Sequence, residues 1–206
     1  GRKHRRIPRA AEGLADLTAP CQAERLSPVM ISQDAGRIHA ALDALRIELP
    51  SWGFANTGTR FGKFLQPAAA ATIEEKFADA GLVHALTGCC PTLALHVLWD
   101  FEHGLESADA VSRLADRHGI RPGSINPNLF QDQQYKFGSF GNPDRSVREA
   151  AVRHTVESAR IGRRLGSRDV SLWFADGSNY PGTASIRRRR AWFEEGLREL
   201  HAALGP

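Results

Sequence analysis

Apolar positions in this chain follow two alternating patterns, short continuous runs and longer stretches with helical spacing. The helical spacing predicts helices over residues 33–49, 72–86, 107–118, 144–165 and 184–204. The short runs predict strands over residues 51–56, 92–98, 123–126 and 169–174. Thr72 followed three residues later by Glu75 is typical of a capping box at a helix start. The order is therefore one helix followed by four βα units.

Repeated βα units predict parallel strands, because parallel strands need crossover connections and the helices then cover the sheet. Four units are half of a (β/α)8 TIM barrel, so we expect an α/β fold that is the N-terminal part of such a barrel, preceded by a helix. A flat doubly wound sheet is the alternative. Residues 1–27 are expected to be a basic, poorly ordered lead-in, and residues 28–206 a partial barrel domain. Since a barrel needs further strands, we expect a piece of a longer protein.

The candidate functional residues lie at the ends of the predicted strands. In TIM barrels the working residues lie at the carboxyl ends of the strands. Two of the predicted strands end with an aromatic residue and a carboxylate, at Trp99-Asp100 and at Trp173-Phe174-Ala175-Asp176. Other residues at strand ends include Trp52, Asn128 and Phe130. Aromatic walls with a few polar groups are typical of sugar sites, although tryptophans that only fill a core are the alternative.

His96 is the titratable candidate among these residues. A histidine can act as acid or base near neutral pH, for example by moving a proton when a sugar ring opens. A hydrogen-bonded structural histidine is the alternative. Only His96, Asp100 and Asp176 could hold a metal ion, which is too few for a complete site, and the roles of both aspartates stay open.

Charge, apolar content and cysteine spacing exclude several classes of partner and site. The formal net charge of +4 comes mostly from the first nine residues and from residues 187–190, which indicates a solvated tail and helix face and no nucleic-acid groove. No apolar run reaches the roughly 20 residues of a membrane helix. Cys21 and the adjacent Cys89 and Cys90 lack metal-type spacing and are interpreted as reduced thiols. We expect a cytoplasmic protein with neither a membrane nor a nucleic-acid partner.

Nucleotide-binding and serine-hydrolase motifs are absent from the sequence. The segment 58–64 has glycine spacing one residue short of a phosphate-binding loop, and no Ser or Thr follows Lys63. No GxGxxG follows a strand, and no GxSxG occurs. The sequence therefore favours neither a dinucleotide-binding fold nor a serine hydrolase.

Six segments together resemble bacterial L-rhamnose isomerase and, more broadly, the sugar isomerases with a xylose-isomerase-like barrel. The resemblance covers residues 31–204, and its segments are Trp52-Gly53-Phe54, Gly58-Thr59-Arg60-Phe61-Gly62-Lys63-Phe64, Ala94-Leu95-His96-Val97-Leu98-Trp99-Asp100, Asn128-Leu129-Phe130-Gln131-Asp132, Tyr135-Lys136-Phe137-Gly138-Ser139 and Trp173-Phe174-Ala175-Asp176-Gly177-Ser178-Asn179-Tyr180-Pro181-Gly182. The last of these is the most specific.

This resemblance implies an enzyme that interconverts L-rhamnose and L-rhamnulose with divalent ions, commonly Mn²⁺, in a homodimer or homotetramer. It implies that His96 acts at the ring oxygen or terminal hydroxyls, and that Phe61 completes the pocket of a neighbouring subunit. The other residues it places in the sugar pocket are Trp52, Trp99, Phe130 and Trp173. The family's metal ligands and catalytic lysine lie on later strands, beyond this sequence. We therefore expect the sugar-pocket half of an enzyme, inactive by itself.

Two other functions stay open on the sequence alone. A half-barrel could bind sugars without chemistry, pairing through its exposed strand edges. A metal-dependent nuclease-type barrel would suit the basic charge, but the arginines lie at the terminus and on a helix, away from the strand ends. Fold alone does not separate these chemistries.

Overall fold

The computed structural model describes residues 28–56, 65–177 and 184–205, with side chains from residue 34 onward. Two compact units are distinguished, Gly1–Ala44 and Leu45–Pro206. The first holds helix α1 (Pro28–Ala44), and the second holds all the other helices and the sheet. Among the described residues, no helix is both long and apolar enough to cross a membrane.

The sheet of the second unit has three parallel strands. These are β1 (Glu48–Pro50), β2 (Thr92–His96) and β3 (Arg121–Asn126), in the order β1-β2-β3. The fourth predicted strand, over residues 169–174, is reduced to one bridge between Val170 and Ile125. There the Ile125 N–H donates to the Asp169 carbonyl at 2.9 Å, and the Ser171 N–H donates to the Ile125 carbonyl at 2.9 Å. Val170 thus occupies the fourth strand position of the sheet, but the pairing with β3 does not extend beyond this one bridge.

The first predicted helix and strand were placed too far along the chain. The helix ends at Ala44, and the strand is β1, with residues 51–53 forming the 3₁₀ turn η1 (Ser51–Gly53) in place of the expected strand. The apolar spacing of Leu45 and Leu49 continues the helical pattern, but Leu49 pairs with Leu93 of β2. Pairing with a distant strand overrides the local spacing.

The remaining helices lie close to their predicted positions. They are α2 (Ile73–Thr87), α4 (Ala108–His118), α5 (Arg145–Arg164) and α6 (Ile186–Leu204). The single helical turn α3 (Val97–Asp100) was not predicted, because its first two residues were expected to continue the strand over residues 92–98. The 3₁₀ turns η2 (Gly104–Ser107) and η3 (Gln133–Phe137) complete the unit. The capping box of Thr72 and Glu75 is confirmed at the start of α2. The side chain of Asp144 accepts from the Ser146 N–H and so caps α5. Short-range caps thus fix both helix starts, and the cap of α2 is the one that the sequence predicts.

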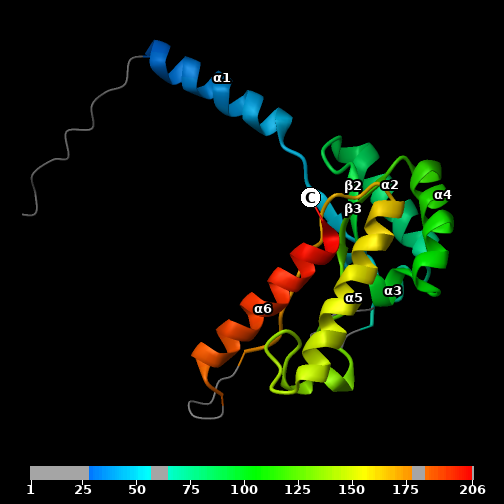
Figure 1. Cartoon of the computed structure of the whole chain (residues 1–206). Coiled ribbons are helices and arrows are strands. Elements are labelled where there is room, and N and C mark those ends of the chain that lie inside the picture. Colours follow the sequence, from blue (N-terminus) through cyan, green and yellow to red (C-terminus); the bar gives the residue numbers. More distant parts are fainter. Residues whose placement is uncertain (1–27, 57–64, 178–183, 206) are drawn as a thin grey trace, which may run out of the picture. The chain divides into compact units, whose positions relative to one another are not determined.

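The helices of the second unit pack in chain order (Figure 1). Helix α2 packs on α4, α4 on α5, and α5 on α6, which lies along it. In a doubly wound sheet the helices alternate between two faces and the strand order reverses. Here the strand order and the order in which the helices pack both follow the chain. The arrangement is that of a (β/α)8 barrel in its N-terminal part, and it excludes the flat doubly wound alternative.

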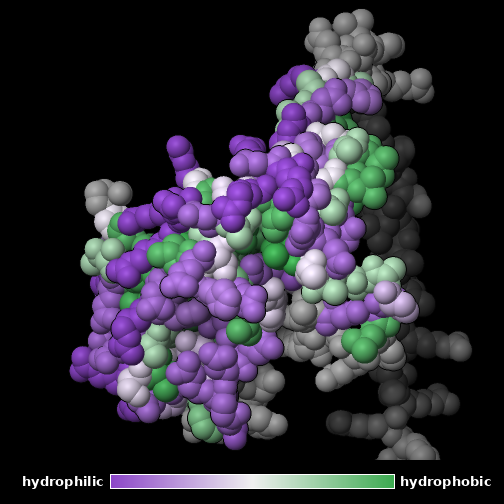
Figure 2. Space-filling model, turned by 90° about the vertical axis from the view of Figure 1, so that its right-hand side faces the viewer, coloured by the Kyte–Doolittle hydropathy of each residue, from purple (hydrophilic) through white to green (hydrophobic). Residues whose placement is uncertain are grey.

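Two apolar clusters hold this unit together. One lies between the sheet and helices α2, α4 and α5, with Phe77, Leu93, Leu95, Ile120 and Ile125 at its centre. The other lies between α5, α6 and the segment after β3, around Leu129, Phe140, Val152 and Leu200. The face seen in Figure 2 is mostly hydrophilic, with apolar residues scattered over it, as is normal for a protein surface.

Helix α6 approaches the second cluster at a glycine. A Cβ atom at position 196 would lie 2.9 Å from Cδ2 of Phe140, so only glycine allows this close approach. The side chain of the next residue, Leu197, is 42% exposed. Because Gly196 occupies the contact with Phe140, the next residue is turned away from the cluster.

Candidate functional site

Five of the six predicted pocket residues lie together. The rings of Trp52, His96, Trp99, Phe130 and Trp173 form a continuous group, here termed the aromatic cluster. His96 stacks on Trp99 with ring centroids 3.6 Å apart and planes at 18°. Phe130 meets Trp173 edge to face at 4.7 Å. The sixth residue, Phe61, lies outside the described residues.

Each ring of the aromatic cluster comes from the carboxyl end of a strand position. Trp52 lies in η1 directly after β1, His96 is the last residue of β2, and Trp99 lies in α3. Phe130 follows β3, and Trp173 follows the bridge at Val170. Trp173 is 46% exposed, so part of the aromatic wall faces outward. Apolar ring faces beside polar groups suit the C–H faces and hydroxyls of a sugar.

The segment that carries Phe130 is held by Asn128. The backbone N–H of Asn128 donates to Nε2 of His154 at 3.0 Å, and its side-chain Nδ2 donates to Asp132 at 2.9 Å. Its Oδ1 accepts from the N–H of Gln131 at 3.1 Å. Gln131 in turn accepts a hydrogen bond from Nε1 of Trp99 at 3.1 Å. These bonds fix Phe130 where it contacts the rings of His96, Trp99 and Trp173.

His96 is a neutral hydrogen-bond donor in this arrangement. Its Nδ1 lies 3.3 Å from the backbone N–H of Leu98, which can only donate, so the ring proton belongs on Nε2. Nε2 is buried and has no hydrogen-bond partner among the described residues. Burial, with smaller contributions from His154 and Lys76, lowers the pKa of His96 from 6.5 to about 4. The imidazole is therefore uncharged near pH 7, and its unpaired Nε2–H can serve an oxygen of a ligand.

Asp100 does not face a ligand. Its carboxylate accepts from Ser51 Oγ at 2.5 Å and from the backbone N–H of His96 at 2.7 Å, and it pairs with Lys76 Nζ at 2.7 Å. The side chains of Lys76 and Asp100 are 3% and 0% exposed. Asp100 therefore joins η1, α2 and the end of β2 beneath the aromatic cluster.

Lys76 was missed by the sequence reasoning, although a signal was present. It lies three residues after Ile73 and directly before Phe77, within the helix predicted over residues 72–86. A lysine at such a position is almost never buried without a charged partner. The sequence thus indicated a buried carboxylate nearby without indicating which one.

Asp176, like Asp100, has a structural role. Its carboxylate accepts from the Ser139 N–H at 2.7 Å, from Ser139 Oγ at 2.9 Å and from the Gly141 N–H at 2.7 Å. Gly138 precedes this turn with φ +108°, and a Cβ there would lie 2.8 Å from Asp176 Oδ2. The open roles of both aspartates are thus assigned, because each ties two distant segments together.

The described residues do not fit a divalent metal ion. Among them, no three His, Cys, Asp or Glu side chains come close enough together to hold one. The carboxylates of Asp100 and Asp176 are committed to the lysine, hydroxyl and N–H donors given above. Both carboxylates therefore serve the fold and are not available as metal ligands.

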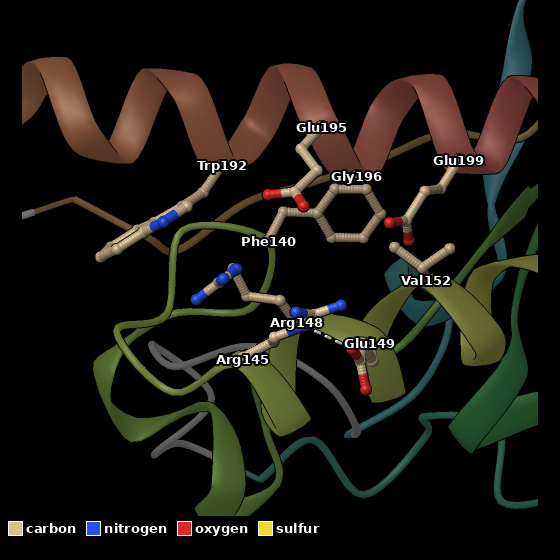
Figure 3. Close-up of a pocket in the computed structure, with 9 residues that line it drawn as sticks. All are labelled: Phe140, Arg145, Arg148, Glu149, Val152, Trp192, Glu195, Gly196 and Glu199. Carbon is tan, nitrogen blue, oxygen red and sulfur yellow. Dashed lines mark hydrogen bonds and ion pairs between the residues drawn. The ribbon is translucent and has the colours of Figure 1, made fainter.

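A pocket between α5 and α6 is too small for a sugar (Figure 3). Its cavity of about 20 Å³ is close to the space that one water molecule needs. Arg148 stacks its guanidinium 4.6 Å from the ring centre of Trp192, and Arg145 pairs with Glu149 at 2.7 Å. This pocket is a narrow gap between two packed helices and has no room for a sugar.

The buried His96 predicts a specific dependence of stability on pH. Because its pKa is lowered on folding, its neutral form stabilises the fold above pH 6.5, and that stability is lost as the pH falls toward 4. The difference between 6.5 and about 4 corresponds to about 3 kcal/mol at most. We expect the free energy of unfolding, measured by urea denaturation, to fall over this window.

The His96→Gln variant is the control for this measurement. Burial also lowers the pKa of His154, so part of the pH dependence remains in the variant. The variant should nevertheless show a flatter curve than the original chain between pH 6.5 and 4. Parallel curves for the two proteins would show that His96 does not titrate as described.

Comparison with known proteins supports the resemblance to sugar isomerases but does not identify the sugar. No family model matches the chain. A probable sugar isomerase of Mesorhizobium japonicum is 33% identical over 186 residues, covering 88% of this chain and 42% of that protein. A probable sugar isomerase of Rhizobium meliloti is 31% identical over 176 residues, covering 83% and 40%. The chain thus spans about two fifths of the length of these curated relatives.

Solved structures support the fold. The 3-keto-D-glucoside 4-epimerase of E. coli aligns with a TM-score of 0.53 at 12% identity, over 77% of this chain and 51% of that one. It has a xylose-isomerase-like TIM barrel, and the partial coverage fits half of such a barrel. The expected fold is therefore confirmed.

Proposed function

We propose that this chain forms the sugar-binding half of an aldose–ketose isomerase, with L-rhamnose and L-rhamnulose as its substrate pair. The observation that carries the proposal is the unpaired Nε2–H of His96 inside the aromatic cluster. Similarity to two curated sugar isomerases supports an isomerase, and the resemblance of the motifs to L-rhamnose isomerase supports the particular sugar.

In this proposal the aromatic cluster binds the cyclic sugar and His96 assists its opening. The rings pack against the C–H faces of the sugar, and Nε2–H donates to the ring oxygen. When the ring opens, the bond between C1 and the ring oxygen breaks, the ring oxygen gains a proton, and the anomeric hydroxyl loses one to become the carbonyl. A donor placed at the ring oxygen stabilises the charge that develops there.

The divalent ion that the resemblance implies, commonly Mn²⁺, would polarise the carbonyl and hydroxyl oxygens of the open sugar. The described residues supply no ligand set for it, so the proposal places its ligands on other strands of a complete barrel. The proposal also includes a homo-oligomer in which Phe61 completes a neighbouring pocket.

The test is an isomerase assay on the complete reading frame with added Mn²⁺. We expect L-rhamnulose to form from L-rhamnose, with kcat/KM at least about tenfold above that for D-xylose, because pocket contacts at the far end of a sugar contribute about 1–3 kcal/mol to discrimination. Preference for another aldose would overturn only the choice of L-rhamnose. Sugar binding without any ketose product would instead support a non-catalytic binding module.

A further inference from the structure

Two adjacent thiols lie at the opposite end of β2 from the aromatic cluster. Cys89 and Cys90 precede Thr92, the first residue of β2, whereas His96 is its last. Their sulfur atoms are 3.7 Å apart. Cys89 is partly exposed and Cys90 is buried, with 4% of its surface exposed. Both are free thiols, and the proposed isomerase chemistry uses neither.

A disulfide between these neighbours is disfavoured by geometry. Disulfides usually join residues whose Cα atoms are 4.4–6.8 Å apart. Adjacent residues across a trans peptide have Cα atoms only about 3.8 Å apart, and no cis peptide occurs among the described residues. The pair is therefore held as two thiols that face one another without closing a bond.

The surroundings of the pair fix its position and activate it. The Ile47 N–H donates to the carbonyl of Cys89 at 2.8 Å, next to the start of β1. Thr87 Oγ1 lies 3.6 Å from the sulfur of Cys90 and 3.5 Å from the backbone N of Cys89. Hydrogen bonds with Thr87 and Cys90, and to a smaller extent the charge of Arg46, lower the pKa of Cys89. Because the thiolate is the form that attacks, Cys89 is the sulfur that reacts first.

A ligand for this pair must bind sulfur strongly and must need only two sulfur ligands. Within the described part of the chain, no third His, Cys, Asp or Glu joins the pair to make a metal site. Structural zinc sites need four ligands, so two thiolates alone do not form one. Trivalent arsenic that already carries one carbon substituent needs two further bonds only. We propose that Cys89 and Cys90 form a dithiol binding site for monosubstituted trivalent arsenicals.

The reaction balances without an oxidant or reductant. The hydrated arsenical carries two hydroxyl groups on arsenic. Two As–S bonds form and two As–O bonds break, and the two hydroxyls leave as water with the two thiol protons. Arsenic stays trivalent and both sulfurs keep their oxidation state. Attack by the Cys89 thiolate comes first, and a rotation of the Cys90 side chain then closes the ring.

The experiment titrates the reduced 206-residue chain with phenylarsine oxide and follows intact mass. A Cys21→Ser background removes the third cysteine. We expect one phenylarsenic group per chain, retained in excess monothiol and released by a small dithiol. Cys89→Ala in the same background should weaken binding about 10²–10⁴-fold, because the second As–S bond is then no longer intramolecular.

Three results would overturn the proposal. These are equal affinity in the Cys89→Ala variant, binding that disappears with Cys21→Ser alone, and labelling that occurs only in denaturant. Circular dichroism confirms that the variants are folded, and Cys89→Ala is the safer variant because Cys89 is the more exposed thiol. His96→Ala should bind phenylarsine oxide normally, so failure of this proposal and failure of the proposed isomerase function are distinguishable.

Discussion

Replacing Lys76 with methionine is expected to lower the free energy of unfolding of this chain by about 3–5 kcal/mol. The substitution removes the cation 2.7 Å from the fully buried carboxylate of Asp100. Ser51 and the His96 N–H still donate to that carboxylate, but its ion pair with Lys76 is lost and the described residues supply no other. A buried charge without a counter-ion is strongly destabilising. Guanidinium denaturation followed by circular dichroism measures the loss.

A surface ion pair of the same type supplies the matched control. Arg117 pairs with Glu74 while both side chains stay more than half exposed, at 60% and 54%. Arg117→Met should therefore cost less than about 1 kcal/mol. The double variant Lys76→Met with Asp100→Asn should recover part of the lost stability, since it removes the unpaired charge. If Lys76→Met costs no more than Arg117→Met, the buried pair does not hold this part of the fold as described.

Under the proposed isomerase function, replacing His96 with alanine in the complete protein is expected to slow turnover of the cyclic sugar by about 10²–10³-fold. The variant removes the one donor that the proposed function places at the ring oxygen. A linear analogue that cannot close its ring should lose much less activity, because it does not need the opening step. Steady-state kinetics on both substrates measures the difference.

His96→Gln tests whether an N–H donor, and not the ring itself, carries this effect. Glutamine retains a donor but loses the stack on Trp99, whose ring centre is 3.6 Å away. We expect it to recover part of the activity on the cyclic sugar. Equal losses on the cyclic and linear substrates in His96→Ala would rule out a ring-opening role and leave His96 a binding residue.

The aromatic cluster could be predicted from the sequence because a local rule identifies its members. Trp99 and Trp173 each follow an apolar run closely, and the carboxyl ends of parallel strands meet at one edge of a sheet. Once the βα order is known, no long-range information is needed to place these residues together. In the structure both rings contact Phe130, at the expected end of the sheet.

The interactions beneath the cluster could not be predicted in this way. Asp100 and Asp176 end similar runs, and the sequence does not distinguish a ligand-binding carboxylate from a structural one. Their partners are far away in the chain, since Asp100 bonds Ser51 across 49 residues and Asp176 bonds Ser139 across 37. No periodicity in a short window contains such a pairing.

The sequence by itself determined the order of the elements, the capped start of α2, and the aromatic residues at the strand ends. Only the tertiary structure decided that β1 begins at Glu48, that His96 presents an unpaired Nε2–H, and that the two carboxylates are structural. The physical reason is the distance along the chain over which each kind of interaction acts. Helical spacing and caps act over a few residues, whereas strand pairing, burial and buried hydrogen bonds depend on segments that meet only after the chain has folded.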